Sequence, residues 1–432
     1  MADEKKPTKS KTTKSTRAKT TSTKKAAPKS PAKKTTSAKT AKTTAVKSTA
    51  KKSPAKTTKK TGRATAPVVF MTGFPGFIGR RLVERLFETR PDISFIFLVQ
   101  KKFEPLAVNT LRHIAERHPQ AADRCEIVFG DITKAHLGLS DEDRHRVTER
   151  ATQVWHLAAI YALGVELALA YRVNVLGTAN VMDLCEQCKK LDRFIYYSTC
   201  YVSGTRTGAV LEDELEMGQN FKNNYEATKF EAEVIVQERR DRIPTVIIRP
   251  AIVIGDSQTG ETDKFDGPYA LIRLHAFIEE KGLIPRGIPL PLIGPGIAKL
   301  NLVPVDYLVK ASVQVAFWKD AVGKVFQISD PRPASTREFV EKLHEIYGVG
   351  PVRGSLPFWV IRGMAQIKWL RETLDIQTDT LVYMDVHAEY DCANTLAALE
   401  GSGIELPDIR EYLPRIVEFV RRNVRFKGQA KY

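Results

Sequence analysis

A tyrosine and a lysine four residues apart form the pair in this sequence best suited to proton transfer. They are Tyr225 and Lys229, within the run from Asn223 to Lys229. Residues four apart on a helix share a face, so the ammonium is expected beside the phenol. A nearby positive charge stabilises phenolate and lowers the pKa of tyrosine, which makes the phenol a usable general acid or base. Chance alone can produce such a pair in a chain of this length, so its place in the fold decides its meaning.

Hydroxyl groups come shortly before this pair, at the end of an apolar run. Residues Arg193–Thr199 are predicted to form a strand that ends in Tyr197-Ser198-Thr199. A parallel strand of this kind carries its functional groups at its carboxyl end. We therefore expect Thr199 to hydrogen-bond the substrate oxygen that Tyr225 protonates.

Three glycines, spaced three residues apart, follow the first apolar run of the chain. They lie between a predicted strand, Pro67–Met71, and a helical pattern at Leu82–Glu88. A strand, a glycine turn and a helix in this order are the context of a dinucleotide fingerprint, in which free N–H groups and the helix dipole bind pyrophosphate. A glycine-rich turn without a ligand is the alternative. The cofactor contacts expected from this turn are Gly73, Phe74, Gly76, Phe77, Ile78 and Gly79.

Two lysines follow the second predicted strand, Ile93–Val99. An acid at this position would hold the ribose 2′-hydroxyl of NAD, whereas basic residues suit the 2′-phosphate of NADP. The strand ends without an acid and runs into Lys101 and Lys102. NADP(H) is therefore favoured, and NAD(H) is retained as the alternative. A further alternative is that both lysines are solvated surface residues that contact no cofactor.

Two further strand ends complete the expected cofactor site. The third predicted strand, Cys125–Phe129, leads into Asp131 and Ile132, and the fourth, Gln153–Ala158, ends in Ala158 and Ala159. Asp131 could hydrogen-bond an adenine, and the small alanines would let the cofactor pass close to the backbone. A turn-forming aspartate and ordinary core alanines are the alternatives.

Strand-like and helix-like runs alternate from Pro67 to about Ile254, where a sixth strand, Thr245–Arg249, ends the pattern. This alternation predicts an α/β fold, a Rossmann-type doubly wound parallel sheet with ligands outside the carboxyl ends of the strands. We assign residues 66–255 to an NAD(P)-binding domain. Residues 256–432 are expected to form mainly a smaller C-terminal substrate-binding subdomain, with about 296–330 returning to the first domain. The helices expected between strands include Val108–Arg117, Asn174–Lys190 and Tyr225–Arg240.

The C-terminal part differs in composition from the alternating region. Residues 281–300 are rich in Gly, Pro and aliphatic residues, which favours pocket lining over regular structure. The stretch Leu356–Leu370 has the pattern of an amphipathic helix that packs over a substrate pocket, with membrane-surface contact as the less favoured use. A last helix is expected over about Ile409–Val424.

The charge of the chain is concentrated in its first residues. Residues 1–66 hold 21 Lys and Arg against two acids, a net +19, and leave 46 basic and 48 acidic residues to the remainder. Residues 1–65 are almost wholly Lys, Thr, Ala, Ser and Pro, so we expect a disordered tail. The tail resembles the Lys/Ala/Pro tails of linker histones, which implies non-specific binding of nucleic acid or another polyanion. A solubilising leader and a transit peptide are the alternatives.

The five cysteines show no framework spacing, which suits a reducing compartment. No stretch is apolar enough for a membrane span or a secretory signal, so the sequence predicts a cytoplasmic protein, with nucleoid association through the tail as a further expectation. The pair Cys185 and Cys188 has zinc-ligand spacing without a second pair, and no metal is expected. Cys200 is expected to be a packing residue rather than a thioester nucleophile.

Taken together and in this order, these motifs resemble the extended short-chain dehydrogenase/reductase superfamily over about residues 67–425. The motifs are Thr72–Gly79, His156–Ala159, Asn174–Thr178, Ser198–Gly204, Tyr225–Lys229, Arg249-Pro250 and Val303–Tyr307. Within it, the chain looks like the thioester-reductase and fatty acyl-CoA reductase branch, also called male sterility. That closer likeness is carried by Leu98–Lys102, Gly130–Thr133, Leu137–Ser140 and Arg249–Gly260.

The resemblance implies roles for particular residues. It implies a triad of Thr199, Tyr225 and Lys229, with Lys229 also on the nicotinamide ribose, Asn174 supporting the site, and Pro250 near the cofactor. The branch often has Arg where this chain has Gln100, which leaves the NADP preference to the lysines.

The resemblance also implies a reaction, the reduction of an acyl thioester or aldehyde by NAD(P)H. No carrier-protein or adenylation domain is present, so the acyl group would arrive on a separate carrier or as acyl-CoA. One alternative is an NAD-dependent hydroxysteroid or nucleotide-sugar dehydrogenase or epimerase. Another is a nucleic-acid-associated protein whose reductase domain senses cofactor. The sequence leaves the oligomeric state open.

Overall fold

The structure is a computed structural model of the 432-residue chain that describes residues 66–161, 164–265, 267–357, 359–360, 363 and 387–423. The tail predicted over residues 1–65 lies outside the described residues. Most of the helix expected over 356–370 also lies outside the described residues. Only residues 356–357, 359–360 and 363 of this range are described.

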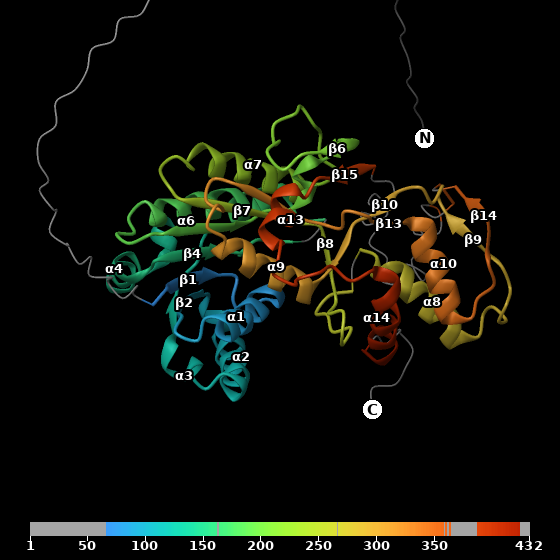
Figure 1. Ribbon diagram of the computed structural model, residues 1–432, viewed down its shortest axis with the longest axis horizontal. Helices are drawn as coiled ribbons and strands as arrows, with labels where there is room; N and C mark the ends of the chain where they lie inside the picture. The colour runs from blue at the N-terminus through green and yellow to red at the C-terminus, as the bar shows by residue number, and fades with distance from the viewer. Residues whose placement is uncertain are drawn as a thin grey trace, which may run out of the picture. The chain divides into compact units, whose positions relative to one another are not determined.

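Seven parallel strands form the central sheet, in the order β12-β7-β5-β4-β1-β2-β3 (Figure 1). The order reverses between β1 and β4, and ligands bind at such a reversal because the following helices cross to opposite faces. The predicted Rossmann-type parallel sheet is therefore confirmed. The strands are β1 (Val68–Thr72), β2 (Ser94–Val99), β3 (Cys125–Phe129), β4 (Gln153–His156), β5 (Arg193–Tyr197), β7 (Thr245–Pro250) and β12 (Val325–Ile328).

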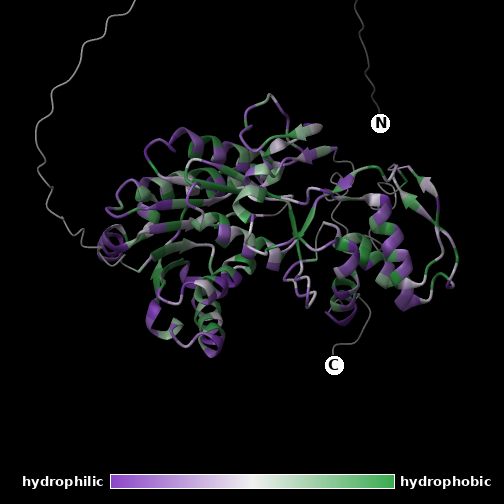
Figure 2. Ribbon diagram, viewed as in Figure 1, coloured by the Kyte–Doolittle hydropathy of each residue, from purple (hydrophilic) through white to green (hydrophobic). Residues whose placement is uncertain are grey.

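Alternation along the strands explains why both faces of the sheet are covered. In β1, Val69 and Met71 join the core under α1 (Phe77–Thr89) and α9 (Val305–Phe317), whereas Phe70 faces the opposite core. A strand that is apolar on both faces must be buried on both faces, as in other α/β sheets. Figure 2 shows this as green along the central strands. The remaining helices around the sheet are α2 (Glu104–Arg117), α3 (Ala121–Arg124), α4 (Asp141–Arg150), α5 (Leu167–Ala170), α6 (Gly177–Cys185), α7 (Asn224–Glu238) and α13 (Ala393–Leu399).

A second hydrophobic cluster gathers three C-terminal helices. It combines residues of α8 (Tyr269–Lys281), α10 (Thr336–Tyr347) and α14 (Ile409–Asn423). Helix α10 begins with a capping box in which Ser335 and Glu338 exchange hydrogen bonds with each other's backbone N–H. Short two-stranded sheets accompany these helices and the adjoining loops. Their strands are β6 (Gly208–Val210), β8 (Ile252–Ile254), β9 (Leu290–Ile293), β10 (Lys299–Leu300), β11 (Leu302–Pro304), β13 (Ala334–Ser335), β14 (Val352–Leu356) and β15 (Ala388–Tyr390).

Two local expectations differ from the structure. The stretch 281–300, expected to be irregular, contains β9 and β10, because both strands pair with segments far along the chain. The helix expected from Asn174 starts earlier, at Leu167, because α5 continues through a π-helical segment, η3 (Tyr171–Leu176), into α6. Among the described residues, no helix is both long and apolar enough to span a bilayer.

A buried ion pair ties the central sheet to helix α7. Arg249 of β7 and Glu233 of α7 lie 2.6 Å apart, and their side chains are 1% and 0% exposed. The guanidinium also donates to the carbonyl oxygens of Glu212 and Glu214. With these partners the buried charge is paired and hydrogen-bonded, which a charge in a protein interior requires.

Replacing Arg249 should therefore be costly. We expect Arg249→Met to lower the free energy of unfolding by about 3–5 kcal/mol, because Glu233 would remain buried without its partner. Urea unfolding measures this loss. The control is Arg85→Gln, which breaks the exposed pair with Glu88 and should cost at most about 1 kcal/mol. Equal, small losses in both variants would contradict the expectation.

Candidate active site

The glycine turn packs directly on the end of β4. Gly73 has a φ of +88°, and a Cβ at this position would lie 2.9 Å from the backbone of Leu157 and Ala158. A Cβ on Gly79 would lie 2.9 Å from the Gly73 carbonyl oxygen. Only glycine permits both the backbone conformation and the close approach. The turn thus brings the start of α1, with its free N–H groups, to the switch point between β1 and β4.

Buried polar side chains join these two strand ends. Thr72 Oγ1 accepts a hydrogen bond from the Ala158 N–H at 3.2 Å and lies 2.7 Å from His156 Nδ1. Burial, with a contribution from the Lys229 charge, lowers the pKa of His156 to about 3. His156 is therefore neutral near neutral pH. Its role is to hold the strand ends in register.

The expected cofactor residues of the turn differ in what they can offer. The ring of Phe74 is buried and stacks on Phe97 at a centroid distance of 4.1 Å, which leaves its backbone for a ligand. The Phe77 ring packs beneath the Arg81 guanidinium at 4.2 Å, and Ile78 packs against the core. Backbone N–H groups rather than side chains are thus the available contacts.

The ends of β2 and β3 lie side by side. Asp131 accepts hydrogen bonds from the N–H and hydroxyl groups of Thr133, and one from Gln100. Burial acts to raise the pKa of Asp131, but these hydrogen bonds and the charge of Lys134 outweigh it and lower the pKa. Asp131 is therefore an ionised acceptor at the strand edge. Ile132 is buried against Gly177, so its side chain supports the helix that follows η3.

Both expected phosphate-binding lysines are exposed, and each already has contacts. Lys101 Nζ lies 2.8 Å from a Glu104 carboxylate oxygen and 4.1 Å from the centroid of Phe129. Lys102 Nζ lies 4.9 Å from the centroid of Phe103. Lys101 therefore lies between the ends of β2 and β3, whereas Lys102 packs on Phe103 of the same short helical turn. Of the alanines after β4, Ala158 is partly buried and Ala159 is exposed.

Two of the expected catalytic residues, Thr199 and Tyr225, meet at the carboxyl edge of the sheet. The hydroxyl of Thr199 hydrogen-bonds Tyr225 and lies 3.4 Å from the carbonyl oxygen of Pro250. Thr199 caps a short helical turn, η4 (Cys200–Ser203), and Tyr225 stands in the first turn of α7. Asn223 caps α7 by accepting a hydrogen bond from the Glu226 N–H. The hydroxyl groups of Thr199 and Tyr225 are thus neighbours at this edge.

Lys229 does not act on Tyr225 as its spacing predicts. Its Nζ donates to the Tyr196 hydroxyl at 2.9 Å and to the Tyr197 carbonyl oxygen at 2.7 Å. Burial raises the pKa of Tyr225, and the hydrogen bond from Thr199 opposes this only partly. The expected lowering of the phenol pKa is therefore wrong. The reason is that both groups are enclosed by protein, which disfavours both charged forms.

Asn174 connects the segment after β4 to the catalytic helix. Its side-chain oxygen accepts from the Ile160 N–H at 2.9 Å, and its amide donates to Thr228 Oγ1 at 3.0 Å. The side chain is 1% exposed, and η3 turns it inward. Asn174 is thus placed to fix α7 relative to β4, in keeping with the supporting role that the resemblance implies.

Two functional neighbours escaped the sequence analysis. The Tyr161 ring meets the Tyr225 ring edge-on, with centroids 5.0 Å apart, and Tyr196 receives the Lys229 ammonium. The signal for Tyr161 was available, because it follows the end of the fourth strand and so belongs to the same sheet edge. Nothing in the spacing indicated Tyr196, because its side chain comes from the interior of β5.

The cysteines are occupied in packing. Cys200 Sγ lies 3.1 Å from the Arg249 carbonyl oxygen, and burial raises the pKa of its thiol well above the ordinary value. Burial also raises the pKa of Cys188 to about 12 and that of Cys185. Protonated, buried thiols are poor nucleophiles and poor metal ligands. Within the described ranges, no group of three or more His, Cys, Asp or Glu side chains is arranged to hold a metal ion.

Comparison with known proteins decides the family. The sequence model of the family described as male sterility protein, an NAD-binding domain, matches residues 71–312. The chain belongs to this family. Its glycine turn therefore lies in a nicotinamide-dinucleotide-binding domain, and the extended short-chain reductase assignment is confirmed.

Relatives of this male sterility domain include named reductases. Human fatty acyl-CoA reductase 1 is 25% identical over 288 residues, which are 58% of this chain and 54% of that protein. The large subunit of L-2-aminoadipate reductase from Penicillium chrysogenum is 28% identical over 304 residues, 65% of this chain and 21% of that subunit. The chain spans about half the length of the fatty acyl-CoA reductases it matches.

Solved structures agree on the fold. The terminal R domain of the myxalamid PKS-NRPS pathway superposes with a TM-score of 0.70 at 25% identity, covering 84% of this chain and 92% of that one. The UDP-glucuronic acid 4-epimerase of Bacillus cereus, in complex with NAD, gives a TM-score of 0.56 at 20% identity, covering 84% of this chain and 98% of that one. The second likeness is one of fold alone.

Lys229 gives the male sterility domain a measurable pH dependence. Burial, partly opposed by Glu233, lowers the pKa of Lys229 to about 7, against about 10.4 in an unfolded chain. Between these values the unfolded state binds the proton and the folded state does not, so stability rises with pH. We expect the free energy of unfolding of wild type, minus that of Lys229→Met, to increase by up to about 1.4 kcal/mol per pH unit from about pH 7 to about pH 9. Urea unfolding of both proteins at three pH values measures it. Parallel curves would contradict it.

Proposed function

We propose that the protein reduces acyl thioesters, or the corresponding aldehydes, with a nicotinamide cofactor. The observation that carries the proposal is the pair of hydroxyl groups, Thr199 and Tyr225, at the carboxyl edge of a dinucleotide-binding sheet. The fatty acyl-CoA reductases to which the chain is similar support an acyl thioester substrate, and the R domain of the myxalamid PKS-NRPS pathway shares its fold. The Gly/Pro-rich, aliphatic stretch 281–300 favours a lipid-like acyl group.

The residues present fit the cofactor. The cradle at Gly73 and Gly79 would be blocked by any Cβ, and free N–H groups at the start of α1 suit phosphates. The bound dinucleotide would supply the hydride that adds to the carbonyl carbon. Asp131 would accept a hydrogen bond from the adenine, and Lys229 would donate to ribose hydroxyls.

The protonation states favour reduction. Because burial raises the pKa of Tyr225, its phenol carries a proton at neutral pH and can donate it to the carbonyl oxygen as negative charge develops there. Thr199 would donate a second hydrogen bond to the same oxygen. Lys229, half-charged near pH 7, would stabilise the phenolate that remains. The tetrahedral product of a thioester would then release the thiol and leave an aldehyde.

A substrate panel tests this function. The full-length protein is offered NADPH or NADH with a long-chain acyl-CoA, a ketosteroid or a nucleotide sugar, and nicotinamide absorbance is followed. We expect turnover with acyl-CoA, a loss of about 10²–10⁴-fold in kcat for Tyr225→Phe, and of about 10²–10³-fold for Thr199→Val. The affinity of both variants for NADPH should stay within about three-fold. Turnover confined to the steroid or the sugar would select the dehydrogenase or epimerase alternative, and full activity of Tyr225→Phe would remove the mechanism.

For the cofactor we propose NADP(H), with Lys101 on the 2′-phosphate. Its support is the position of Lys101 at the boundary of β2 and β3, and the neighbouring Glu104 is the group a phosphate would have to displace. Lys101→Ala should weaken NADPH binding about five- to ten-fold and leave NADH binding unchanged. Titrations with both cofactors measure this. Lys189→Ala, which removes another exposed, ion-paired lysine, is the control. Equal effects on NADPH and NADH would contradict the assignment.

For residues 1–65 we propose non-specific binding of nucleic acid or another polyanion. The support is their charge, since residues 1–65 carry a net +19 and the remainder of the chain a net −2. The proposal is independent of the reductase chemistry. It adds association with the nucleoid to a cytoplasmic location.

A further inference from the structure

The loop from Asp256 to Lys264, called here the 256–264 loop, contacts both the dinucleotide-binding helix and the aromatic cluster at Tyr225. It follows β8 and leads toward α8. Neither the glycine motif nor the proposed triad includes it. Its contacts fall into three groups, at its base, at its acidic middle and at its end.

The base of the loop is fixed by close packing and hydrogen bonds. Ser257 donates through both its N–H and its hydroxyl to the Asp306 carboxylate of α9, at 2.9 Å each. Gly260 has a φ of +75°, and a Cβ there would lie 2.3 Å from the Arg415 carbonyl oxygen of α14. Asp256 accepts from the N–H groups of Gln258 and Thr259. The loop therefore has one defined course.

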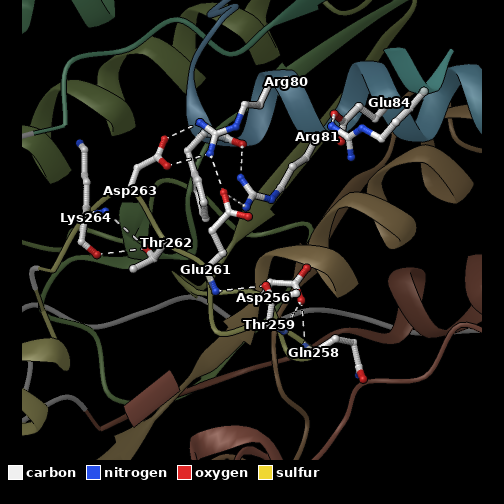
Figure 3. Close-up of polar contacts among 12 residues, drawn as sticks. Arg80, Arg81, Glu84, Asp256, Gln258, Thr259, Glu261, Thr262, Asp263 and Lys264 are labelled. Atoms are coloured by element: carbon white, nitrogen blue, oxygen red, sulfur yellow. Dashed lines mark hydrogen bonds and ion pairs between the residues drawn. The ribbon is translucent and has the colours of Figure 1, made fainter. Parts of the chain in front are cut away.

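The middle of the loop is held by two arginines of α1, immediately after the last glycine of the motif. Arg80 binds Asp263 with both guanidinium nitrogens, at 2.5 and 2.7 Å, and Arg81 lies 2.9 Å from Glu261 (Figure 3). Paired N–H donors on one carboxylate fix its direction as well as its distance. In Figure 3 both arginines extend from α1 toward the acids of the loop. The position of the loop thus depends on α1.

The end of the loop reaches the catalytic phenol through one aromatic ring. Lys264 Nζ lies 4.9 Å from the centroid of the Tyr161 ring. The Tyr161 ring in turn meets the Tyr225 ring at 5.0 Å and 89°. Both geometries are attractive, a cation over an aromatic face and an edge-to-face pair. A continuous line of contacts therefore runs from α1 to Tyr225.

We propose that the 256–264 loop couples dinucleotide binding at α1 to the position of Tyr225. Arg80 and Asp263 set the loop, and Lys264 and Tyr161 transmit its position to the phenol. All four are positioning residues, because none of them needs to touch the reacting atoms. The inference rests on the proposed function for its kinetic test only.

The acidic residues of the loop predict the direction in which dinucleotide affinity should change when the loop is altered. Asp263 and Glu261 neutralise arginines at the helix end where pyrophosphate is expected, so they oppose the binding of an anion there. Neutralising Asp263 removes the nearer of the two acids that contact Arg80, which keeps its 3.3 Å contact with Glu261, and so strengthens dinucleotide binding. The same change releases the loop and so weakens the positioning of Tyr225. Tighter binding with slower turnover is a combination that general destabilisation would not produce.

The test compares full-length wild type with Asp263→Asn, Lys264→Met and their double variant. Asp263→Asn should bind NADPH about three-fold more tightly in a titration without acyl substrate. Each single variant should lower kcat about three- to ten-fold, and the double variant no further than the lower single variant, because both cut one line of contacts. Tyr161→Ala should lower kcat similarly, whereas Tyr161→Phe, which keeps the aromatic ring, should have the kcat of wild type. Glu88→Gln, an acid-to-amide change at the far end of α1, is the charge-matched control and should alter neither quantity.

Hydrogen exchange supplies a readout that needs no turnover. In wild type, NADPH should change exchange of the backbone amides in the 256–264 loop as well as in the glycine turn. In Asp263→Asn the glycine turn should still respond and the loop should not. A loop response that persists in Asp263→Asn, additive kcat losses, or weaker NADPH binding would each overturn the coupling. If wild type binds NADPH but reduces no acyl thioester, the proposed function fails, and the exchange and binding results alone decide the coupling.

Discussion

A buried network of hydrogen bonds links the glycine turn to α7, the helix that carries Tyr225. Each polar group in it is taken from water, so leaving one unpaired would cost about 1–3 kcal/mol. The hydrogen-bond network therefore behaves as one unit that fixes β1, β4, η3 and α7 against one another. Its members, in order, are Thr72, His156, Thr178, Asn174 and Thr228. Because every member of this network is hydrogen-bonded, the glycine turn and Tyr225 are held at a fixed separation.

The sequence predicted the parts of this arrangement that depend on local pattern. Six strands were expected from short apolar runs, and all six lie in the sheet within two residues of their expected ends. The glycine turn was also placed correctly, since its spacing reflects a backbone requirement that Gly73 meets. The seventh strand, β12, was expected only as part of a returning segment, because a four-residue apolar run cannot be told from a buried helix by pattern alone.

The structure brings together several residues named from the sequence, but through contacts that the sequence did not predict. Thr199 and Tyr225 are hydrogen-bonded, and Asn174 lies where it can support α7. Helical spacing places Lys229 on the same face as Tyr225 but says nothing of the Tyr196 hydroxyl that accepts its hydrogen bond. Such contacts join residues far apart in sequence, and no spacing rule encodes them. The pKa direction of Tyr225 was missed for the same reason, because burial is a tertiary property.

Burial of both proton-transfer groups has a chemical consequence. Enclosure raises the pKa of Tyr225 and lowers that of Lys229 to about 7, so near neutral pH the phenol is neutral and the amine is only partly charged. A neutral phenol is the right donor for a carbonyl that gains a hydride, whereas oxidation of an alcohol would need the phenolate first. A buried phenolate would be stable only beside a protonated Lys229. An enclosed Tyr–Lys pair therefore favours reduction near neutral pH, and raising the pH above about 7 removes the Lys229 charge that a phenolate would need.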